Sequence, residues 1–315
     1  MIEMTVREAK RRSAAALSAT ASNGAVPSPT PELDADCFLQ EIMQKDRTWL
    51  LLHADEPLTA AQQGALSEAV RRRRTGLPVA YITSRKEFYG LDFFVSPDVL
   101  IPKPDTEILV ERAAELLRGR IRARPASVPT VCDMCAGSGC IAIAVLRTLS
   151  DGSAVPAERL PSITAADISG RALAVARRNA GALLPERLRN NLRFVQSNLF
   201  ENAAGRYDFI LTNPPYVPAQ EARALLSDGR GEPLLALDGD VGESGGPSGT
   251  SDGLAVIRRL VPQAAANLAP GGALLLEAGE YNAEQAAAML RQNGFSGVTI
   301  HRDLAGQLRV VEGRR

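Results

Sequence analysis

The stretch Asp133-Met-Cys-Ala-Gly137-Ser-Gly139 decides how this chain is expected to fold. It joins a short apolar run at residues 130–134 to a longer apolar-rich segment at residues 139–149. The run has the length and composition of a buried strand, and the segment has those of a helix. Glycines between a strand and a helix allow a tight turn in which a ligand can approach the backbone closely. The stretch therefore predicts an α/β fold with a candidate ligand site at this turn.

The alternation of strand and helix continues to the end of the chain, which has 315 residues. The sequence predicts strands at residues 130–134, 162–166, 192–196, 207–212, 273–277, 297–302 and 307–312. It predicts helices at residues 139–149, 171–183, 253–268 and 284–293. This order implies a doubly wound, seven-stranded, mostly parallel sheet with helices on both faces. The link between the last two strands is too short for a crossover helix, so they should form an antiparallel hairpin.

The first third of the chain has a different pattern. Residues 1–76 are expected to form a small helical domain, with helices at 5–17, 32–44 and 46–52 and a fourth from Thr59, where Gln62 completes a capping box. Residues 77–105 are interpreted as a linking β-hairpin, with strand patterns at 79–83, 87–89 and 91–95 and Gly90 in the turn. Residues 106–315 would form the main domain, opening with a helix at 107–117 that Asp105 or Thr106 caps. Residues 151–161 and 239–251 look like insertions, the second disordered.

Composition excludes several classes of protein. Lys+Arg and Asp+Glu both number 36, so the net charge is zero, which argues against binding DNA by neutralising its phosphates. The cluster Arg71–Arg74 is interpreted as a solvated helix end, with a patch for an RNA-containing partner as the minority alternative. No apolar run is long enough for a membrane span and no signal peptide is evident, so we expect a cytoplasmic protein.

The four cysteines and two histidines do not suggest a metal site. Cys132, Cys135 and Cys140 cluster, but no second cluster or nearby histidine completes a zinc set, so no metal is expected. Cys132 and Cys135 form a C-x-x-C pair that leaves a redox role open. Packing of small apolar side chains in a strand and turn is the favoured interpretation.

Two further segments bear on the ligand. Asp167 follows Asp133 by 34 residues, and the insertion at 151–161 accounts for the excess over the usual spacing of about 20. A carboxylate at that strand end can accept hydrogen bonds from both hydroxyls of a ribose. A G-x-G-x-x-G fingerprint is absent, which favours a nucleoside with a short charged tail over a dinucleotide. Asn198 and Leu199, after the next strand, could contact an adenine, although this segment alone is better interpreted as a polar loop end.

The tetrapeptide Asn213-Pro214-Pro215-Tyr216 concerns a second ligand. It follows the strand at residues 207–212, and its two prolines fix the backbone at the edge of the sheet where ligands bind. The Asn213 side-chain oxygen and the Pro214 carbonyl could accept both N–H bonds of a planar NH2 group, with Tyr216 beside it. Such a site would act by orientation rather than by acid–base chemistry. A purely structural Pro-Pro turn is the competing interpretation.

Taken together, these motifs resemble the class I S-adenosylmethionine-dependent methyltransferases, and within them the HemK-type protein-(glutamine-N5) methyltransferases of peptide chain release factors. The resemblance also includes the segments Glu87-Phe-Tyr-Gly90, Ile101-Pro-Lys-Pro-Asp-Thr-Glu107, Glu232-Pro-Leu-Leu-Ala-Leu-Asp-Gly239, Asp252-Gly-Leu254 and Pro270-Gly-Gly272. Three positions depart from the usual family residues: Cys135 replaces Gly, Asn198 replaces Asp, and Lys103 replaces Arg.

The resemblance implies S-adenosylmethionine as cofactor and a glutamine as substrate. The loop that would cradle the methionine part contains Cys135, Ala136, Gly137, Ser138 and Gly139. Asp167 would hold the ribose, Asn198 and Leu199 would border the adenine, and Asn213 would contact both cofactor and substrate.

On the substrate side, Asn213, Pro214, Pro215 and Tyr216 would grip the glutamine of the Gly-Gly-Gln motif in class I release factors. The helical domain would dock the release factor, and the enzyme would work as a monomer. The alternatives are a glutamine of a ribosomal protein, a DNA or RNA amino group, and a non-catalytic binding role.

Overall fold

The computed structural model describes residues 4–19, 26–151, 155–243 and 245–315. The chain divides into two compact units. Unit 1 combines Met1–Arg85 with Ala224–Gly231, and unit 2 combines Lys86–Arg223 with Glu232–Arg315. Among the described residues, no helix is both long enough and apolar enough to cross a membrane.

Unit 1 is helical, as the sequence predicts. Its helices are α1 (Val6–Ser18), α2 (Pro31–Met43), α3 (Arg47–Leu52), α4 (Ala60–Arg73) and α5 (Val79–Thr83). The predicted capping box at the start of α4 is confirmed, because the Thr59 and Gln62 side chains each accept from the other residue's backbone N–H. Leu17, Phe38 and Leu39 lie at the centre of the apolar core of this unit.

The prediction of a strand at residues 79–83 is wrong, because these residues form helix α5. The segment is rich in β-branched and aromatic residues, which favour strands, but five residues are too few to distinguish a period of 2 from one of 3.6. Pro78 starts the turn, and its carbonyl accepts from the Tyr81 and Ile82 N–H groups. The rest of the predicted hairpin is confirmed as strands β1 (Arg85–Phe88) and β2 (Leu91–Phe94).

Unit 2 contains the seven-stranded sheet that the sequence predicts. In spatial order its strands are β5 (Leu192–Gln196), β4 (Ser162–Asp167), β3 (Thr130–Met134), β6 (Tyr207–Thr212), β7 (Leu268–Glu277), β9 (Leu308–Arg314) and β8 (Ser296–Arg302). The first five are parallel, whereas β9 runs antiparallel to both β7 and β8, which confirms the predicted hairpin at the end of the chain.

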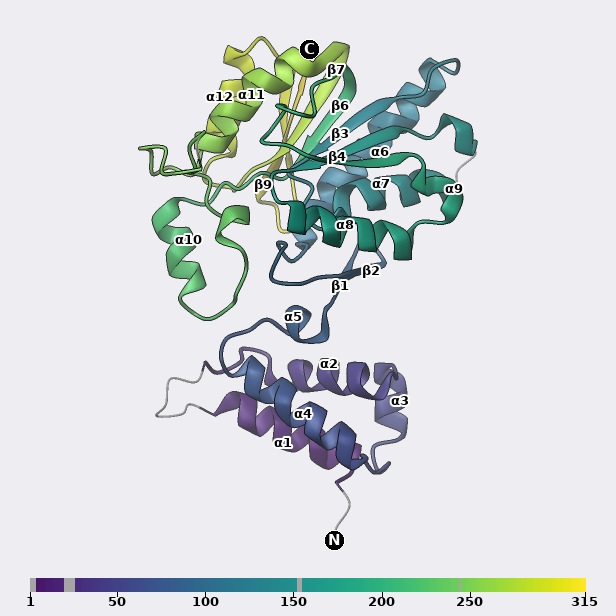
Figure 1. The fold of residues 1–315 in the computed structure, drawn as a ribbon, viewed down its shortest axis with the longest axis vertical. Helices are drawn as coiled ribbons and strands as arrows, with labels where there is room; N and C mark the ends of the chain where they lie inside the picture. Colours follow the sequence, from purple (N-terminus) through teal and green to yellow (C-terminus); the bar gives the residue numbers. More distant parts are fainter. Residues whose placement is uncertain (1–3, 20–25, 152–154, 244) are drawn as a thin grey trace. The chain divides into compact units, whose positions relative to one another are not determined.

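Helices cover both faces of the sheet (Figure 1). One face carries α6 (Glu107–Ala123), α7 (Cys140–Ser150) and α8 (Gly170–Leu183), and the other carries α11 (Ala255–Asn267) and α12 (Ala283–Gln292). Side chains alternate along each strand, so that Val131 and Leu211 belong to the first core and Cys132 and Ile210 to the second. The shorter helical elements are η1 (Pro104–Thr106), η2 (Ala157–Arg159), α9 (Glu186–Arg189), α10 (Ala219–Leu226) and η3 (Leu234–Ala236).

The order of the strands fixes the place of the ligand site. The chain runs outward from β3 through β4 to β5, and then returns to add β6 on the other side of β3. Met134, the last residue of β3, pairs with Ala166 on one side and with Thr212 on the other. The loops after β3, β4 and β6 therefore meet at one edge, at the switch point where open α/β sheets bind ligands.

The two predicted insertions have different outcomes. Residues 152–154 of the first lie outside the described residues, and the segment that follows them contains η2. For the second, Ser244 lies outside the described residues, but the prediction of disorder is wrong for the rest of 239–251. Asp240 in this segment is 3% exposed, and Val241 pairs with Pro247 in an isolated antiparallel bridge.

Candidate active site

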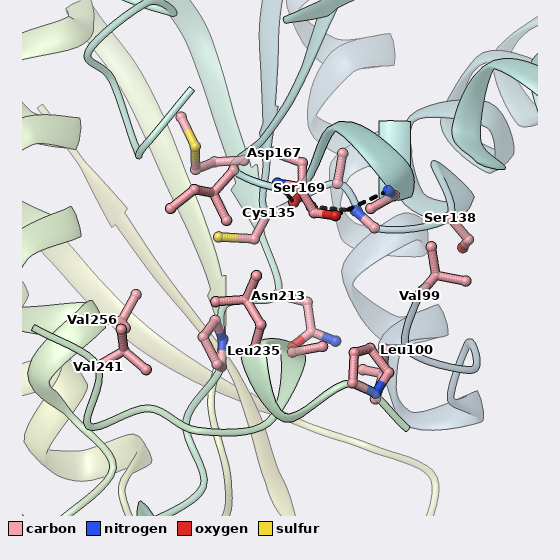
Figure 2. A pocket seen from close by; sticks show the side chains of 18 of the residues that line it. Val99, Leu100, Cys135, Ser138, Asp167, Ser169, Asn213, Leu235, Val241 and Val256 are labelled. Atoms are coloured by element: carbon pink, nitrogen blue, oxygen red, sulfur yellow. Dashed lines mark hydrogen bonds between the residues drawn. The ribbon is translucent and has the colours of Figure 1, made fainter. Parts of the chain in front are cut away.

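A cavity of about 240 Å3 lies at the carboxyl edge of the sheet (Figure 2). Three loops that the sequence singles out contribute to its wall: the loop after β3, the loop after β4 and the loop after β6. Cys135 and Asp167 lie on one side in Figure 2, and Asn213 lies across the cavity from them. The structure thus brings the two groups of predicted site residues together around one space.

The loop after β3 is a tight turn that leaves room beside its backbone. Gly137 and Gly139 both have a positive φ, 53° and 78°. A Cβ added at Gly137 would meet nothing within 4 Å, whereas one at Gly139 would lie 3.1 Å from the Ala176 Cβ. Gly139 is therefore required for packing against α8, and Gly137 exposes its backbone to the cavity.

Two carboxylates hold this loop in place, Asp133 buried and Asp167 partly buried. Asp133, fully buried, accepts from the Ala142 N–H at 3.1 Å and so ties the strand to the start of α7. Burial raises the pKa of Asp133 to about 7. Asp167 accepts from the Gly137 N–H through Oδ2 and from the Ser169 N–H through Oδ1, both at 2.8 Å. Burial also raises the pKa of Asp167. Because each oxygen of Asp167 has a further lone pair, the carboxylate can accept hydrogen bonds from two hydroxyls of a ligand.

Cys135 adopts the left-handed conformation with φ of 62°, which is unfavourable for a residue with a Cβ. Burial and the neighbouring Asp167 raise the pKa of its thiol, and burial raises the pKa of the Cys132 thiol too. Thiols that resist ionisation are poor nucleophiles, so the C-x-x-C pair lacks the electropositive setting of a redox site. This supports the interpretation of these cysteines as packing residues.

The loop after β5 places Asn198 and Leu199 at the cavity wall. The Asn198 amide is engaged at both ends: its nitrogen donates to Glu201 at 2.8 Å, and its oxygen accepts from Arg259 at 2.9 Å. Leu199 has a positive φ of 49° and is 6% exposed. The Leu199 side chain is apolar and the Asn198 amide is already engaged, so packing of Leu199 against a flat ligand is the simpler role for this loop.

The tetrapeptide after β6 turns two of its side chains toward the cavity. Asn213 and Pro215 line the cavity, whereas Pro214 and Tyr216 are not among the lining residues. The Tyr216 hydroxyl instead donates to Glu277 Oε1 at 3.3 Å, and burial raises the pKa of this phenol. The Asn213 side-chain nitrogen donates to the Thr106 hydroxyl at 3.2 Å, which leaves its oxygen free to accept from a ligand.

The segment that was expected to be disordered supports this tetrapeptide. Asp240 accepts from the Ala219 N–H, from the Gly253 N–H and from the Thr250 hydroxyl, at 3.1, 2.9 and 3.0 Å. The Gly239 N–H donates to the Val217 carbonyl at 2.8 Å. Gly239 and Asp240 are therefore bound along the chain that leaves the Asn-Pro-Pro-Tyr turn, and Asp240 also holds Thr250 and Gly253.

Comparison with known proteins identifies the chain. The model of the PrmC N-terminal domain matches residues 12–83, and that of the methyltransferase small domain matches residues 108–228. The release factor glutamine methyltransferase of Bordetella pertussis is 37% identical, over 90% of this chain and 94% of the relative. That of Burkholderia pseudomallei is 38% identical, over 94% of this chain and 96% of the relative. The chain belongs to the release factor glutamine methyltransferase family.

Solved structures of lower similarity include a 16S rRNA N2 G1207 methyltransferase of Thermus thermophilus in complex with AdoMet and guanosine. It is 18% identical with a TM-score of 0.47, and the match covers 73% of this chain and 49% of that one.

Four further residues contribute to the site, although the sequence analysis did not predict them as site residues. Asn179 of α8 donates to the Ser138 and Phe94 carbonyls, which ties the β3 loop to the hairpin. Thr106, Asp240 and Glu277 support the tetrapeptide. Only Glu277 carries a sequence signal, because a carboxylate ends an apolar run at the carboxyl edge of a parallel strand.

Proposed function

We propose that this protein transfers a methyl group from S-adenosylmethionine to the side-chain nitrogen of a glutamine in a release factor. The single observation that carries the proposal is the cavity itself. A loop with an open backbone and the partly buried carboxylate of Asp167 face a rigid Asn-Pro-Pro-Tyr turn across one space, in a chain of the glutamine methyltransferase family.

The described residues fit the cofactor. Gly137 leaves the space beside its backbone open, and Asp167 has unused lone pairs for the two ribose hydroxyls. Leu199 would pack on the adenine, and residues 135–139 would enclose the methionine part. When bound, S-adenosylmethionine supplies an activated methyl group on a sulfonium that leaves as a neutral thioether.

The protein's own contribution to the reaction would be orientation. A carboxamide nitrogen is a poor nucleophile, because its lone pair is delocalised into the carbonyl. Asn213 Oδ1 would accept one N–H bond of the glutamine, and the carbonyl of Pro214, which lies in the chain between the lining residues Asn213 and Pro215, would accept the other. Together they would hold the glutamine nitrogen toward the cofactor side of the cavity. Such positioning can supply a large part of a rate enhancement. The extra proton of the nitrogen would leave to solvent, so no dedicated base is needed.

The finer parts of the proposal concern the substrate and the domains. The glutamine would be that of the Gly-Gly-Gln motif of class I release factors, which act in the cytoplasm. Residues 1–76 would dock the release factor, residues 77–105 would form the linking segment, and residues 106–315 would carry both binding sites. The protein would work as a monomer and would not use DNA.

The test is an assay with labelled S-adenosylmethionine and three separate acceptors: a class I release factor, a large-subunit ribosomal protein and DNA. The proposal predicts label on the release factor alone. Label on DNA would indicate an amino-methyltransferase of nucleic acid, and label on the ribosomal protein would indicate the sister activity. Label on none of them would favour a binding role.

A further inference from the structure

The short connection between β7 and α12 provides two side chains that bind the backbone of the Asn-Pro-Pro-Tyr turn. The carbonyl oxygen of Tyr216 accepts hydrogen bonds from the Asn282 side-chain nitrogen and from the Tyr281 hydroxyl, both at 3.1 Å. Asn282 is 1% exposed, whereas Tyr281 is 54% exposed. One backbone carbonyl of the tetrapeptide therefore has two side-chain donors, one in the interior of the protein and one at its surface.

Asn282 makes this contact instead of capping its own helix. It occupies the N-cap position of α12, where an asparagine oxygen usually accepts from a backbone N–H of the first turn. Among the described residues, the Asn282 side chain makes no cap hydrogen bond, and its buried Oδ1 has no partner. A buried acceptor without a partner is unfavourable. Because the local rule is broken in favour of a contact with Tyr216, a functional reason is expected.

The backbone of the connection turns tightly enough to bring both donors to the same carbonyl. The Gly279 carbonyl accepts from the Asn282 N–H and from the Ala283 N–H, both at 3.0 Å. A Cβ added at Gly279 would lie 2.9 Å from the Tyr281 ring, which is too close unless the ring moves. The turn at the start of α12 therefore sets the positions of the Tyr281 and Asn282 side chains.

Tyr216 is held at its side chain as well as at its carbonyl. Its hydroxyl donates to Oε1 of Glu277, the last residue of β7, at 3.3 Å. Its carbonyl oxygen also lies close to the backbone of Gly253, where an added Cβ would be only 2.3 Å away. The peptide group that follows Tyr216 therefore has little freedom to rotate while these contacts are in place.

These contacts fix the tetrapeptide at the end that lies away from β6. At the other end, Thr212 is the last residue of β6 and is paired with both β3 and β7. Between the two fixed ends, the rings of Pro214 and Pro215 restrict the backbone to one range of φ. With so few free torsions in between, a movement of the Tyr216 carbonyl would be transmitted to the Pro214 carbonyl.

We propose that Asn282 and Tyr281 are positioning residues for methyl transfer. By holding the Tyr216 carbonyl, they keep the Asn-Pro-Pro-Tyr turn in the orientation in which its Asn213 and Pro214 oxygens receive the glutamine. This inference rests on the proposed function. Neither side chain belongs to the described wall of the cavity, so both act through the turn and affect kcat rather than cofactor binding.

The main test replaces Asn282 by a residue that can still cap the helix. Asn282→Asp keeps the shape of the side chain but puts an oxygen where the nitrogen donates to the Tyr216 carbonyl. Aspartate is among the best N-cap residues, and its charge is favourable at a helix N-terminus. If Asn282 only stabilised α12, this change would be tolerated. Two facing oxygens repel and displace the turn, so we instead expect kcat to fall roughly 10-fold or more, with KM and cofactor affinity nearly unchanged.

A second variant and a matched control accompany this test. Tyr281→Phe removes the other donor at an exposed residue, so it should affect folding little, and the loss of one hydrogen bond predicts a fall in kcat of roughly 2- to 10-fold. The control is Asn191→Asp. The Asn191 side-chain nitrogen donates to the Leu160 and Pro161 carbonyls at 3.3 Å, at the amino ends of β4 and β5 and away from the cavity. This control should leave kcat unchanged.

The outcomes distinguish this inference from the proposed function. If wild-type protein methylates the release factor and both Asn282→Asp and Tyr281→Phe keep its kcat, the inference is overturned and the function stands. An equal fall in kcat for Asn191→Asp, or a parallel loss of cofactor affinity, would also overturn it. If wild-type protein transfers no methyl group to the release factor, the proposed function itself fails. Thermal unfolding identifies a variant that has not folded, and the other variant of the pair then decides.

Discussion

The most specific prediction from the structure concerns Gly253, which follows the ordered segment behind the tetrapeptide. Its φ is 73°, and a Cβ added there would lie 2.3 Å from the Tyr216 carbonyl oxygen. Real Cβ atoms essentially never approach closer than 3.0 Å, so Gly253→Ala requires a shift of about 0.7 Å (3.0 minus 2.3) between these two segments. The nearest atoms, the carbonyl oxygen and carbon of Tyr216 and the nitrogen of Pro218, all belong to the backbone, which cannot rotate away as the end of a side chain can.

We expect this shift to move the Asn-Pro-Pro-Tyr turn while the cofactor loop stays in place. A misplacement of about 1 Å at a positioned reactant can lower a rate about 100-fold, so a 0.7 Å shift predicts a fall in kcat of roughly 10- to 100-fold. Cofactor affinity should change little, because Gly253 does not line the cavity to which the β3 and β4 loops contribute. The assay is steady-state methyl transfer to the release factor together with calorimetric cofactor binding.

The same segment supplies a matched control. Gly249 has a φ of 82°, similar to that of Gly253, but a Cβ added there would meet nothing within 4 Å. Gly249→Ala therefore introduces the same backbone strain, about 1–2 kcal/mol, without the clash. We expect it to lower the melting temperature by a few degrees and to leave kcat unchanged. Equal kcat values for the two variants would refute the reasoning that the segment positions the turn.

Three further predictions concern the cavity and the buried carboxylate of β3 beside it. Asn213→Ala should lower methyl transfer by about 100-fold or more and leave cofactor binding largely intact; equal loss of both would show that its role is misassigned. Asp167→Asn should weaken cofactor binding, measured by calorimetry, by roughly 10-fold or more, because a carboxylate acceptor to ligand hydroxyls is lost; unchanged affinity would contradict this. Burial raises the pKa of Asp133 from 3.8 to about 7. Between these pH values the folded state retains a proton that the unfolded chain releases. The contribution of Asp133 to the free energy of unfolding therefore falls as the pH rises from about 4 to about 7. Asp133→Asn removes this pH dependence. The free energy of unfolding, measured in urea, should therefore decrease less in the variant than in the wild type over this pH range, and parallel pH profiles would contradict the assignment.

Most of the sheet could be predicted because its central strands, β3, β4 and β6 and the apolar run of β7, are buried. The predicted bounds for β3, β5 and β6 are the observed ones. Mostly apolar side chains mark the buried strands β3 and β6. The edge strand β5 is only partly buried and is marked by the strand-favouring residues Phe194 and Val195. The start of β7 was less visible, because Leu268–Glu277 contains Pro270 and two glycines before its apolar run. Proline and glycine are unfavourable in strands, so local composition hides that part.

The elements that were missed depend on contacts between distant residues. Residues 239–243 and 245–251 have the composition of a disordered loop, but the buried carboxylate of Asp240 accepts from the Ala219 N–H, outside the segment, and from Thr250 and Gly253 at its far end. Helix α5 formed against strand-favouring composition because Tyr81 is buried in the structure. Neither contact has a sequence period that could reveal it.

The position of the candidate site could also be predicted from the sequence, whereas the orientation of its side chains could not. The sequence predicted that Asp167 and Asn213 lie near one another, because both follow strands whose carboxyl ends meet at one edge of the sheet. It could not show that the Tyr216 side chain donates to Glu277 behind the turn, nor that the Asn198 amide is engaged by Glu201 and Arg259. Such details depend on side-chain orientation, which strand and helix patterns do not specify.

The central claim is that the cavity methylates a glutamine side chain, and mapping of the methyl group tests it most directly. A class I release factor would be incubated with the protein and methyl-labelled S-adenosylmethionine, digested, and analysed by mass spectrometry. The account predicts one added methyl group on the side-chain nitrogen of the glutamine in the Gly-Gly-Gln motif, and none with Asn213→Ala. A methyl group on any other residue, or an unmodified release factor beside a fully active control enzyme, would contradict it.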